Sequence, residues 1–396
     1  MNVLVVNCGS SSLKYQLINS ETEAVLAKGL CERIGLDGRL VYQKEGGEKE
    51  KTDVAMPTHK QAIKLVLEAL VNPVSGAIKD LSEIDAVGHR VVHGGEKFAS
   101  STILTEDVIA VIEECNDLAP LHNPANLIGI RACQELMPNV PMVGVFDTAF
   151  HQTMPEKAYM YGIPYKYYEK YGVRRYGFHG TSHSYVSKRI AEILGKDVTE
   201  LKTIVCHLGN GSSICAVKNG ISVDTSMGLT PLEGLTMGTR SGDIDPSIIE
   251  FIAQKEGLTL SEVINVLNKK SGVEGLSEIS SDFRDLEDAA KEGNVRAQMT
   301  RDVFNYRVAK YVGAYVAAMG GVDVVCFAGG VGENDGGVRE GVMNYLGYLG
   351  VEVDVEKNNS VRGGEHLITT ANSKVPCYIV STNEELAICR ETVRLV

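Results

Sequence analysis

The stretch LVVNCGSSSLKYQLI, residues 4–18, places Asn, Gly and three serines between two apolar runs. A turn rich in backbone N–H groups, hydroxyls and one lysine can hold phosphate. The stretch lacks the second glycine and the Gly-Lys-Ser/Thr of a P-loop. The alternation of Leu13, Tyr15 and Leu17 with polar residues predicts a second strand rather than a helix. We therefore expect a strand, a tight turn and a strand, with the turn either binding phosphate or forming an ordinary polar hairpin.

Two further turns have a similar composition. VCHLGNGSSICAV, residues 205–217, repeats the order of apolar strand, Gly/Asn/Ser turn and strand, and VCFAGGVGEN, residues 325–334, ends a strand in Gly-Gly-x-Gly. The latter lacks the G-x-G-x-x-G spacing of a dinucleotide site. The repeat favours two similar α/β halves that offer polar turns to one shared ligand; the alternative is a chance likeness of two hairpins.

Three charged residues follow strand-like runs or lie in glycine-rich loops. Arg90 lies in IDAVGHRVVHGG, Asp147 ends VPMVGVF, and Arg240 lies in GLTMGTRSGDIDP. No apolar periodicity explains an arginine in such a loop, and the planar, permanently charged guanidinium binds anions well. Two such arginines with one aspartate favour an anion site over isolated surface residues.

Two histidine pairs and one carboxylate leave alternatives open. His89 and His93, and likewise His179 and His183, have the i, i+4 spacing of zinc ligands on a helix. Gly and Val around both pairs are poor helix context, and neither pair has the H-E-x-x-H pattern, so zinc is disfavoured. We interpret His179 as a polar donor beside an anion. Glu384 in VSTNEELAICRE either stabilises the start of the last helix or supplies a carboxylate to Mg²⁺.

The elements that must position these residues alternate between strands and amphipathic helices, which predicts an α/β protein. Strands are expected at residues 3–6, 86–91, 142–146, 203–206, 214–217, 322–327 and 378–380, and helices at 59–71, 106–116, 124–137, 183–194, 260–268 and 295–319. Asn219-Gly220 predicts a hairpin turn. Residues 37–53 are expected to form an exposed hairpin or loop.

Composition restricts the class of protein. A chain of 396 residues with 44% apolar and 23% charged residues predicts two or three globular domains. Thirty-nine basic against 51 acidic residues give a net charge of −12, which argues against a nucleic-acid or membrane-surface partner. Nine cysteines without a C-x-x-C pair are typical of reduced, buried thiols. The N-terminus lacks a signal-peptide pattern, and we expect a cytoplasmic protein.

Nine motifs, in order from residue 2 to the last helix, resemble the acetate kinase family: NCGSSSLKY, HRVVHGGEKF, PLHNPANL, FDTAFH, RRYGFHGTSH, HLGNGSS, DTSMGLTPLEGLTMGTRSGDIDP, FAGGVGEN and TNEE. The resemblance implies an α/β fold of two duplicated actin-like ATPase (ribonuclease H-like) domains with a nucleotide cleft between them. It implies a first domain of residues 1–150, on which the helix 384–396 packs back. The second domain, residues 151–383, would carry most of the nucleotide site.

The resemblance also implies a function: reversible, direct in-line phosphoryl transfer from ATP to acetate, giving acetyl phosphate and ADP, with Mg²⁺ (or Mn²⁺), in a homodimer. The implied catalytic and metal-binding residues are Arg90 for the carboxylate, Asp147 as acid or base, His179 and Arg240 as stabilisers of the transition state, and Asn7 and Glu384 for the metal. The implied nucleotide-binding residues are Ser10, Ser12, Lys14, His207, Leu208, Gly209, Asn210, Gly211, Asp282, Phe283, Arg284, Gly330, Val331, Gly332, Glu333 and Asn334. The implied apolar substrate pocket is Val92, Leu121, Phe178 and Pro231.

General chemistry supports these roles. A carboxylate with a pKa of ~4.3 is already an ionised nucleophile at pH 7, so no strong base is required. The reaction needs two anions aligned and the charge on the transferred group cancelled, which arginines do well. We therefore expect Asp147 to orient an arginine or a metal-bound water, or to align the carboxylate, rather than to take a substrate proton.

Other substrates and classes remain open. One methylene is worth only ~1–3 kcal/mol in an apolar pocket, so propionate should be a poorer substrate rather than an excluded one. Val92, where the related propionate kinases tend to have a smaller residue, favours acetate. A sugar or alcohol kinase of the same fold would need a polar pocket and a true base. A chaperone-like ATPase would not need three basic side chains aimed at a second anion.

Overall fold

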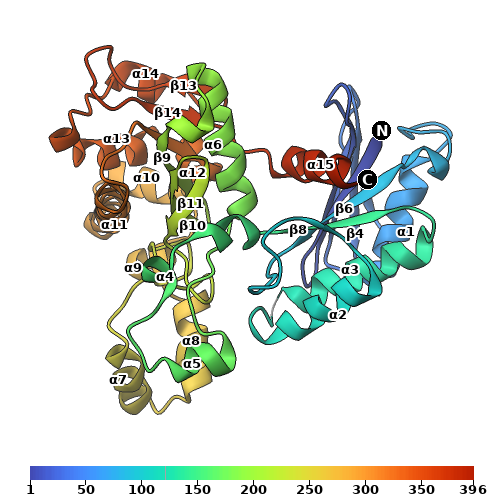
Figure 1. The fold of residues 1–396 in the computed structure, drawn as a ribbon, viewed down its shortest axis with the longest axis horizontal. Helices are drawn as coiled ribbons and strands as arrows, with labels where there is room; N and C mark the ends of the chain where they lie inside the picture. The colour runs from blue at the N-terminus through green and yellow to red at the C-terminus, as the bar shows by residue number, and fades with distance from the viewer. Residues whose placement is uncertain (121) are drawn as a thin grey trace. The chain divides into compact units, whose positions relative to one another are not determined.

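The structure is a computed structural model that describes residues 1–120 and 122–396. The chain divides into two compact units, residues 1–150 with 383–396, and residues 151–382. Each unit contains one mixed β-sheet with helices packed against it (Figure 1). We call them unit 1 and unit 2.

The sheet of unit 1 has the strand order β5-β4-β3-β2-β1-β6-β8-β7. The strands β1, β6 and β8 are parallel to one another, and the remaining pairs are antiparallel. The strand bounds are β1 Asn2–Cys8, β2 Leu13–Asn19, β3 Val25–Glu32, β4 Arg39–Lys44, β5 Glu50–Asp53, β6 Ala86–Val91, β7 Thr102–Ile103 and β8 Met142–Phe146. The helices are α1 His59–Leu70, α2 Glu106–Glu114, α3 Asn123–Leu136 and α15 Glu384–Leu395.

The sheet of unit 2 has the order β11-β10-β9-β12-β14-β13. Its strands are β9 Lys202–Leu208, β10 Ser212–Lys218, β11 Ile221–Thr225, β12 Val324–Ala328, β13 Glu365–Leu367 and β14 Cys377–Val380. Its helices are α4 Glu156–Tyr159, α5 Lys166–Tyr171, α6 Gly180–Leu194, α7 Ser247–Glu256, α8 Leu260–Lys269, α9 Gly272–Ser277, α10 Phe283–Lys291, α11 Val295–Met319, α12 Gly329–Asn334, α13 Gly336–Asn344 and α14 Val355–Ser360.

The two sheets share one topology. The order β3-β2-β1-β6-β8 in unit 1 corresponds strand for strand to β11-β10-β9-β12-β14 in unit 2. In both units, the first three strands of this order are antiparallel to their neighbours, and the last two are parallel to the third strand, β1 or β9. The prediction of two similar α/β halves is therefore confirmed, and the similar turns at residues 9–12 and 209–211 occupy equivalent hairpins.

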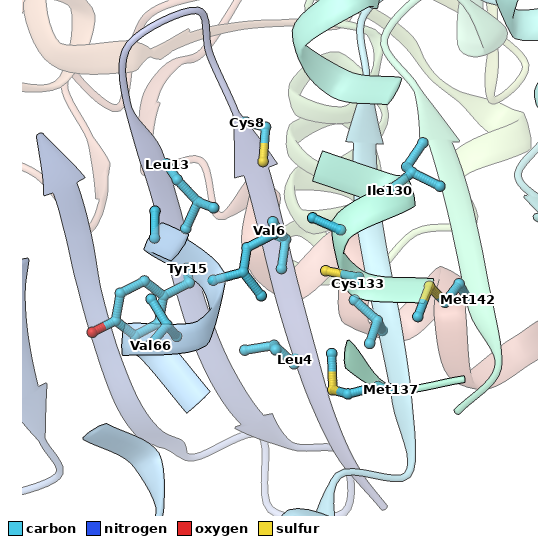
Figure 2. Packing of buried hydrophobic residues seen from close by; sticks show 14 of the residues in the cluster. Leu4, Val6, Cys8, Leu13, Tyr15, Val66, Ile130, Cys133, Met137 and Met142 are labelled. Carbon is cyan, nitrogen blue, oxygen red and sulfur yellow. The ribbon is translucent and has the colours of Figure 1, made fainter. Parts of the chain in front are cut away.

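Alternation along β1 decides which side chains face the core and which face the site. Leu4, Val6 and Cys8 point to the side covered by α1 and α3, where Figure 2 shows them beside Leu13 and Tyr15 of β2. The buried Tyr15 hydroxyl donates to the Val41 carbonyl at 3.0 Å. Because successive side chains of a strand point to opposite faces, the odd-numbered residues of β1 point to the other side of the sheet.

That other side is covered by α15, the last helix of the chain. Val3 and Val5 of β1 form a second core cluster with Val145 of β8 and with Ile388 and Cys389 of α15. In Figure 1 this helix, drawn in red, lies against the sheet that contains β6 and β8. The C-terminal segment therefore belongs to the same compact unit as the N-terminus.

The predicted helices and strands all have counterparts, with two corrections. The residues from His179 to His183 begin α6 and are not poor helix context, because the sequence Gly-Thr-Ser-His forms the first turn of that helix. The Gly-rich end of VCFAGGVGEN folds as the short helix α12. Hairpins occur at Asn219-Gly220 and within residues 37–53 as predicted. All nine cysteines are buried free thiols, as predicted.

Candidate active site

In unit 1, three polar side chains meet at the carboxyl ends of neighbouring parallel strands. Asn7 is the last residue but one of β1, Arg90 of β6, and Asp147 follows β8 directly. By alternation, all three share the face of the sheet that α15 covers, the face of Val5 and Val145. Parallel strands present their carboxyl ends at one edge, which is where sites form in such sheets.

Arg90 and Asp147 form a shielded ion pair. The Arg90 Nε atom lies 3.1 Å from both oxygens of Asp147, and Nη2 lies 2.5 Å from Oδ2. Arg90 Nη1 also donates to Oδ1 of Asn7 at 3.4 Å. Asp147 is 1% exposed, whereas the Arg90 side chain is 24% exposed. Asp147 thus holds the guanidinium in one orientation and leaves part of it accessible to a ligand.

Glu384 stands in the first turn of α15 beside this ion pair. The capping hydrogen bond of the helix is made by Asn383, which accepts from the Leu386 N–H at 3.0 Å, so Glu384 does not serve as the cap. Burial raises the pKa of Glu384 to about 7; the Arg90 charge opposes the rise and the Asp147 charge adds to it. Burial also disfavours the charged form of Arg90, but the carboxylates outweigh it and raise the pKa of the guanidinium.

These donors fit a hard divalent cation. The amide oxygen of Asn7 and the carboxylate of Glu384 are the ligand types that Mg²⁺ binds in proteins. Burial and a like-charged neighbour keep Glu384 partly protonated near neutral pH. A bound cation would compensate that repulsion, so the local electrostatics favour one.

In unit 2, the start of α6 brings histidines to the ends of β9 and β10. His179 precedes the first helical residue with a left-handed backbone (φ 56°), which is uncommon for a residue other than glycine and is often found at functional sites. Its ring lies 4.3 Å, centroid to centroid, from that of His207 in β9. His207 is paired in register with Ser213 of β10, so the helix start and the hairpin share one face.

Ser213 links two of these histidines. Its Oγ lies 2.9 Å from Nδ1 of His179 and 2.8 Å from Nε2 of His183. Burial lowers the pKa of His183 well below its usual value, so its ring is neutral. His183 Nδ1 has no hydrogen-bond partner among residues 1–120 and 122–396. An orphaned buried N–H is rarer than an orphaned acceptor, so we place the His183 proton on Nε2.

The proton on His183 fixes the state of His179. His183 Nε2–H donates to Ser213 Oγ, and the Ser213 hydroxyl then donates to His179 Nδ1. With Nδ1 accepting, the remaining ring nitrogen Nε2 of His179 carries its proton. His179 is therefore a hydrogen-bond donor at Nε2.

Arg240 and His179 approach the same point above the β9–β10 turn. A Cβ placed on Gly211 would lie 3.4 Å from Arg240 Nη1 and 3.6 Å from His179 Nε2. Within the described part of the chain no carboxylate pairs with Arg240, whose Nη1 has only long contacts to Pro231 O (3.4 Å) and Met237 Sδ (3.8 Å). Burial lowers the pKa of its guanidinium. A half-buried cation without a counter-ion, beside an N–H donor, is suited to a multiply charged anion.

Unit 2 also contains a cavity of about 680 Å³ next to the same turn. Of the residues expected to bind a nucleotide, eight line it: Gly209, Asn210, Asp282, Phe283, Arg284, Gly330, Val331 and Asn334. Its carboxylates are already paired: Asp282 with Arg284 at 2.6 Å, Asp335 with Arg301 at 3.0 Å and Glu287 with Lys291 at 2.9 Å. Arg362 also lines the cavity, and among the described residues its guanidinium contacts only the carbonyls of Asn359 and Val361. With the carboxylates paired and Phe283 and Val331 in the lining, the cavity suits a nucleoside.

Other expected residues lie elsewhere. Leu208 and Gly332 are buried, and the Glu333 carboxylate accepts from the N–H groups of Gly329 and Thr382, which attaches α12 to the end of β14. Lys14 points away from the core as predicted and lines a groove of about 390 Å³ on the outer face of β2–β5. Ser10 and Ser12 lie in the β1–β2 turn, Val92 is buried in unit 1 and Phe178 is buried in unit 2; Leu121 lies outside the described residues.

Comparison with known proteins identifies the relationship of this chain. A sequence model described as the Acetokinase family matches residues 2–390. The chain belongs to the acetokinase family. It is 72% identical over 396 residues to the acetate kinase of Agathobacter rectalis, covering 100% of both chains. It is similar to the crystal structure of Porphyromonas gingivalis acetate kinase (TM-score 0.96, 51% identity, 100% and 99% coverage) and to that of a propionate kinase from Francisella tularensis (TM-score 0.93, 43% identity, full coverage of both).

Several residues that shape the site of this acetokinase had no interpretable role in the sequence. Ser213 lies inside the HLGNGSS motif, but its bridging contact joins segments 30 residues or more apart. His183 carries a spacing signal for zinc, whereas its contact is to a serine. Arg362 lines the cavity from the segment after α14, where no motif marks it.

Proposed function

We propose that this protein is an acetate kinase that transfers the terminal phosphoryl group of ATP to acetate, reversibly. The observation that carries the proposal is the arrangement of His179 Nε2 and Arg240 Nη1 around Gly211, beside a nucleoside-sized cavity. Membership of the acetokinase family and relatives of 60–72% identity that are named acetate kinases support the same conclusion.

The carboxylate of acetate would bind Arg90. Asp147 accepts three contacts from this guanidinium and stays fully buried, so its task is to orient Arg90. Acetate is ionised at neutral pH and needs no general base, which agrees with an Asp147 already committed to an ion pair. Positioning of the nucleophile against the phosphoryl group is the main catalytic contribution in phosphoryl transfer.

His179 and Arg240 would stabilise the charge on the phosphoryl group as it moves. Both are donors, one neutral and one cationic, and both approach a single point from different elements. Preorganised donors of this kind cost no reorganisation when charge develops, and the loss of one typically costs ~10²–10³ in turnover. Arg240 has no competing carboxylate in the described residues, so its charge is available to the substrate.

The nucleotide would bind with its nucleoside in the cavity of unit 2. Gly209, Asn210, Gly330 and Val331 line this cavity and would contact the nucleoside. We propose Mg²⁺, or Mn²⁺, as the cofactor, held through Asn7 and Glu384. When bound, this cation would neutralise phosphate charge. Lys14, exposed on β2, would contact the phosphates.

Finer features of the proposal concern substrate size, domains and assembly. Val92, which is buried in unit 1 and whose N–H donates to Asn126 Oδ1 at 3.0 Å, would limit the size of the acid, as would Phe178 and Pro231 of unit 2, so that acetate is preferred to propionate. We also propose that units 1 and 2 are the two domains, and that the protein is a cytoplasmic homodimer. No helix in the described part of the chain is long and apolar enough to span a bilayer.

The decisive experiment is ATP-dependent trapping of acyl phosphate with hydroxylamine, with acetate, propionate and butyrate compared in the presence of Mg²⁺. Acetyl hydroxamate formed fastest from acetate is the expected result. Faster product from propionate would keep the chemistry and change the substrate. ATP binding without product from any of the three acids would reject the proposed function.

A further inference from the structure

Arg240 lies in a segment that has no regular secondary structure. Residues 226–246 connect β11 to α7 and carry both Arg240 and Pro231. No ladder of backbone hydrogen bonds holds such a segment. A functional side chain in it is positioned only as well as the tertiary contacts that fix the backbone around it.

Glu233 connects this segment to the chain that precedes α6. Its Oε1 accepts from Nη2 of Arg175 at 2.7 Å, and its Oε2 accepts from the hydroxyl of Tyr161. The side chains of Arg175 and Glu233 are 17% and 31% exposed. Partial shielding and a third partner distinguish this ion pair from an exposed surface pair, which contributes little.

The two partners of Glu233 also bind the backbone of the same segment. Arg175 Nη1 donates to the carbonyls of Ser226 and Met227, both at 3.1 Å. The Tyr161 hydroxyl accepts from the Leu229 N–H at 2.9 Å. The carboxylate therefore completes a network that holds the backbone at three positions, Ser226, Met227 and Leu229.

Gly228 allows the carboxylate to lie directly on the backbone. A Cβ at this position would be 1.8 Å from Glu233 Oε2 and 2.3 Å from the Tyr161 hydroxyl oxygen. Only glycine leaves that space, so the close approach is built into the sequence of the segment.

The network reaches Arg240 through a carbonyl. Pro231, two residues before Glu233, accepts from Arg240 Nη1 at 3.4 Å. On the other side of Glu233, the Gly234 N–H donates to Asp243 Oδ1 at 2.8 Å, which closes the loop that contains Arg240. Glu233 thus lies in sequence between Pro231, whose carbonyl contacts the Arg240 guanidinium, and Gly234, whose hydrogen bond closes the loop.

We propose that Glu233 is a positioning residue for Arg240, acting through Arg175, Tyr161 and the Pro231 carbonyl. The inference rests on the phosphoryl transfer proposed above. Neutralising Glu233 removes the charge that holds Arg175 and Tyr161 together over Gly228. The Pro231 carbonyl then shifts, and the guanidinium shifts with it; a misplacement of ~1 Å of a catalytic group can cost ~10²-fold in rate.

The test is E233Q, which keeps the size of the side chain and one acceptor oxygen. We expect kcat for hydroxamate formation to fall about 10- to 100-fold with the KM for ATP unchanged, because none of the residues of the network lines the nucleotide cavity. E365Q is the matched control. It neutralises another Arg–Glu ion pair of unit 2, Arg189–Glu365 at 2.5 Å, and should have wild-type kinetics.

A double-variant comparison separates positioning from a general structural role. If Glu233 acts through Arg240, then E233Q combined with R240A should be no slower than R240A alone. Independent, multiplicative losses would overturn the proposal, and so would a wild-type kcat in E233Q. If E233Q does not fold, the same comparison can be made with Y161F, alone and combined with R240A. A wild-type protein that makes no acyl phosphate would reject the proposed function, whatever the variants do.

Discussion

Gly211→Ala should separate catalysis from folding more cleanly than the loss of a charged residue. The new methyl carbon would lie 3.4 Å from Arg240 Nη1 and 3.6 Å from His179 Nε2, which is ordinary van der Waals contact. Gly211 does not have a positive φ angle, so alanine fits its backbone. At such positions Gly→Ala stabilises a protein by ~0.4–1 kcal/mol through the unfolded state. We therefore expect G211A to fold at least as stably as the wild type.

Its activity should nevertheless be nearly lost. A phosphoryl oxygen that accepts from both donors must come within ~2.7–2.9 Å of each nitrogen. The methyl group would occupy that space and prevent both contacts. Losing one transition-state donor costs ~2.7–4 kcal/mol, or ~10²–10³ in turnover, so G211A should lose at least this much.

The assay is hydroxamate formation at saturating ATP and acetate, measured beside the unfolding midpoint in urea. G347A is the control, because a Cβ at Gly347 meets nothing within 4 Å; it should be as stable and as active as the wild type. A near-normal kcat in G211A would mean that His179 and Arg240 do not act together on the phosphoryl group at this point. A large drop in the urea midpoint of G211A would refute the argument that alanine fits at this position.

Three other substitutions test separate parts of the site. D147N should lower kcat/KM for acetate by about as much as R90A, ~10²-fold, since Asp147 acts by orienting Arg90; near-normal turnover would exclude any catalytic role for Asp147. V92A should raise kcat/KM for propionate relative to acetate by ~10-fold, measured by competition; an unchanged ratio would remove Val92 from the pocket. Burial raises the pKa of Asp224 to about 6, although Arg175 opposes the rise. In the unfolded chain the pKa of Asp224 is near 3.8. Between this pH and about 6 the unfolded chain has lost the proton while the folded protein still holds it, so the free energy of unfolding falls as the pH rises. Above about pH 6 this loss of stability is complete. D224N should therefore increase the urea midpoint more at pH 7.5 than at pH 4.5, and equal shifts would contradict the buried carboxylate.

Local sequence determined the elements and indicated many of the residues that we propose to be catalytic. Period-two alternation in residues 13–17 gave the second strand and placed Lys14 opposite Leu13 and Tyr15. Arg90 and Asp147 stood out because charged residues directly after or within apolar strands are costly unless they have a function. The similarity of the turns after β1 and β9 reflected the repeated strand order of the two units. These signals are local because hydrogen bonding within a hairpin and the burial of one face involve neighbours in sequence.

Only the tertiary structure decided how those residues act. Pairing of β6 with β8 brings Arg90 against Asp147, 57 residues away, which supports the expectation that Asp147 orients an arginine. Ser213 joins His179 to His183, and Glu233 reaches Arg175 across 58 residues. No periodicity encodes such contacts, because they depend on strand register and on where loops cross. The sequence determined which chemistry was present; packing determined the protonation, orientation and partner of each group.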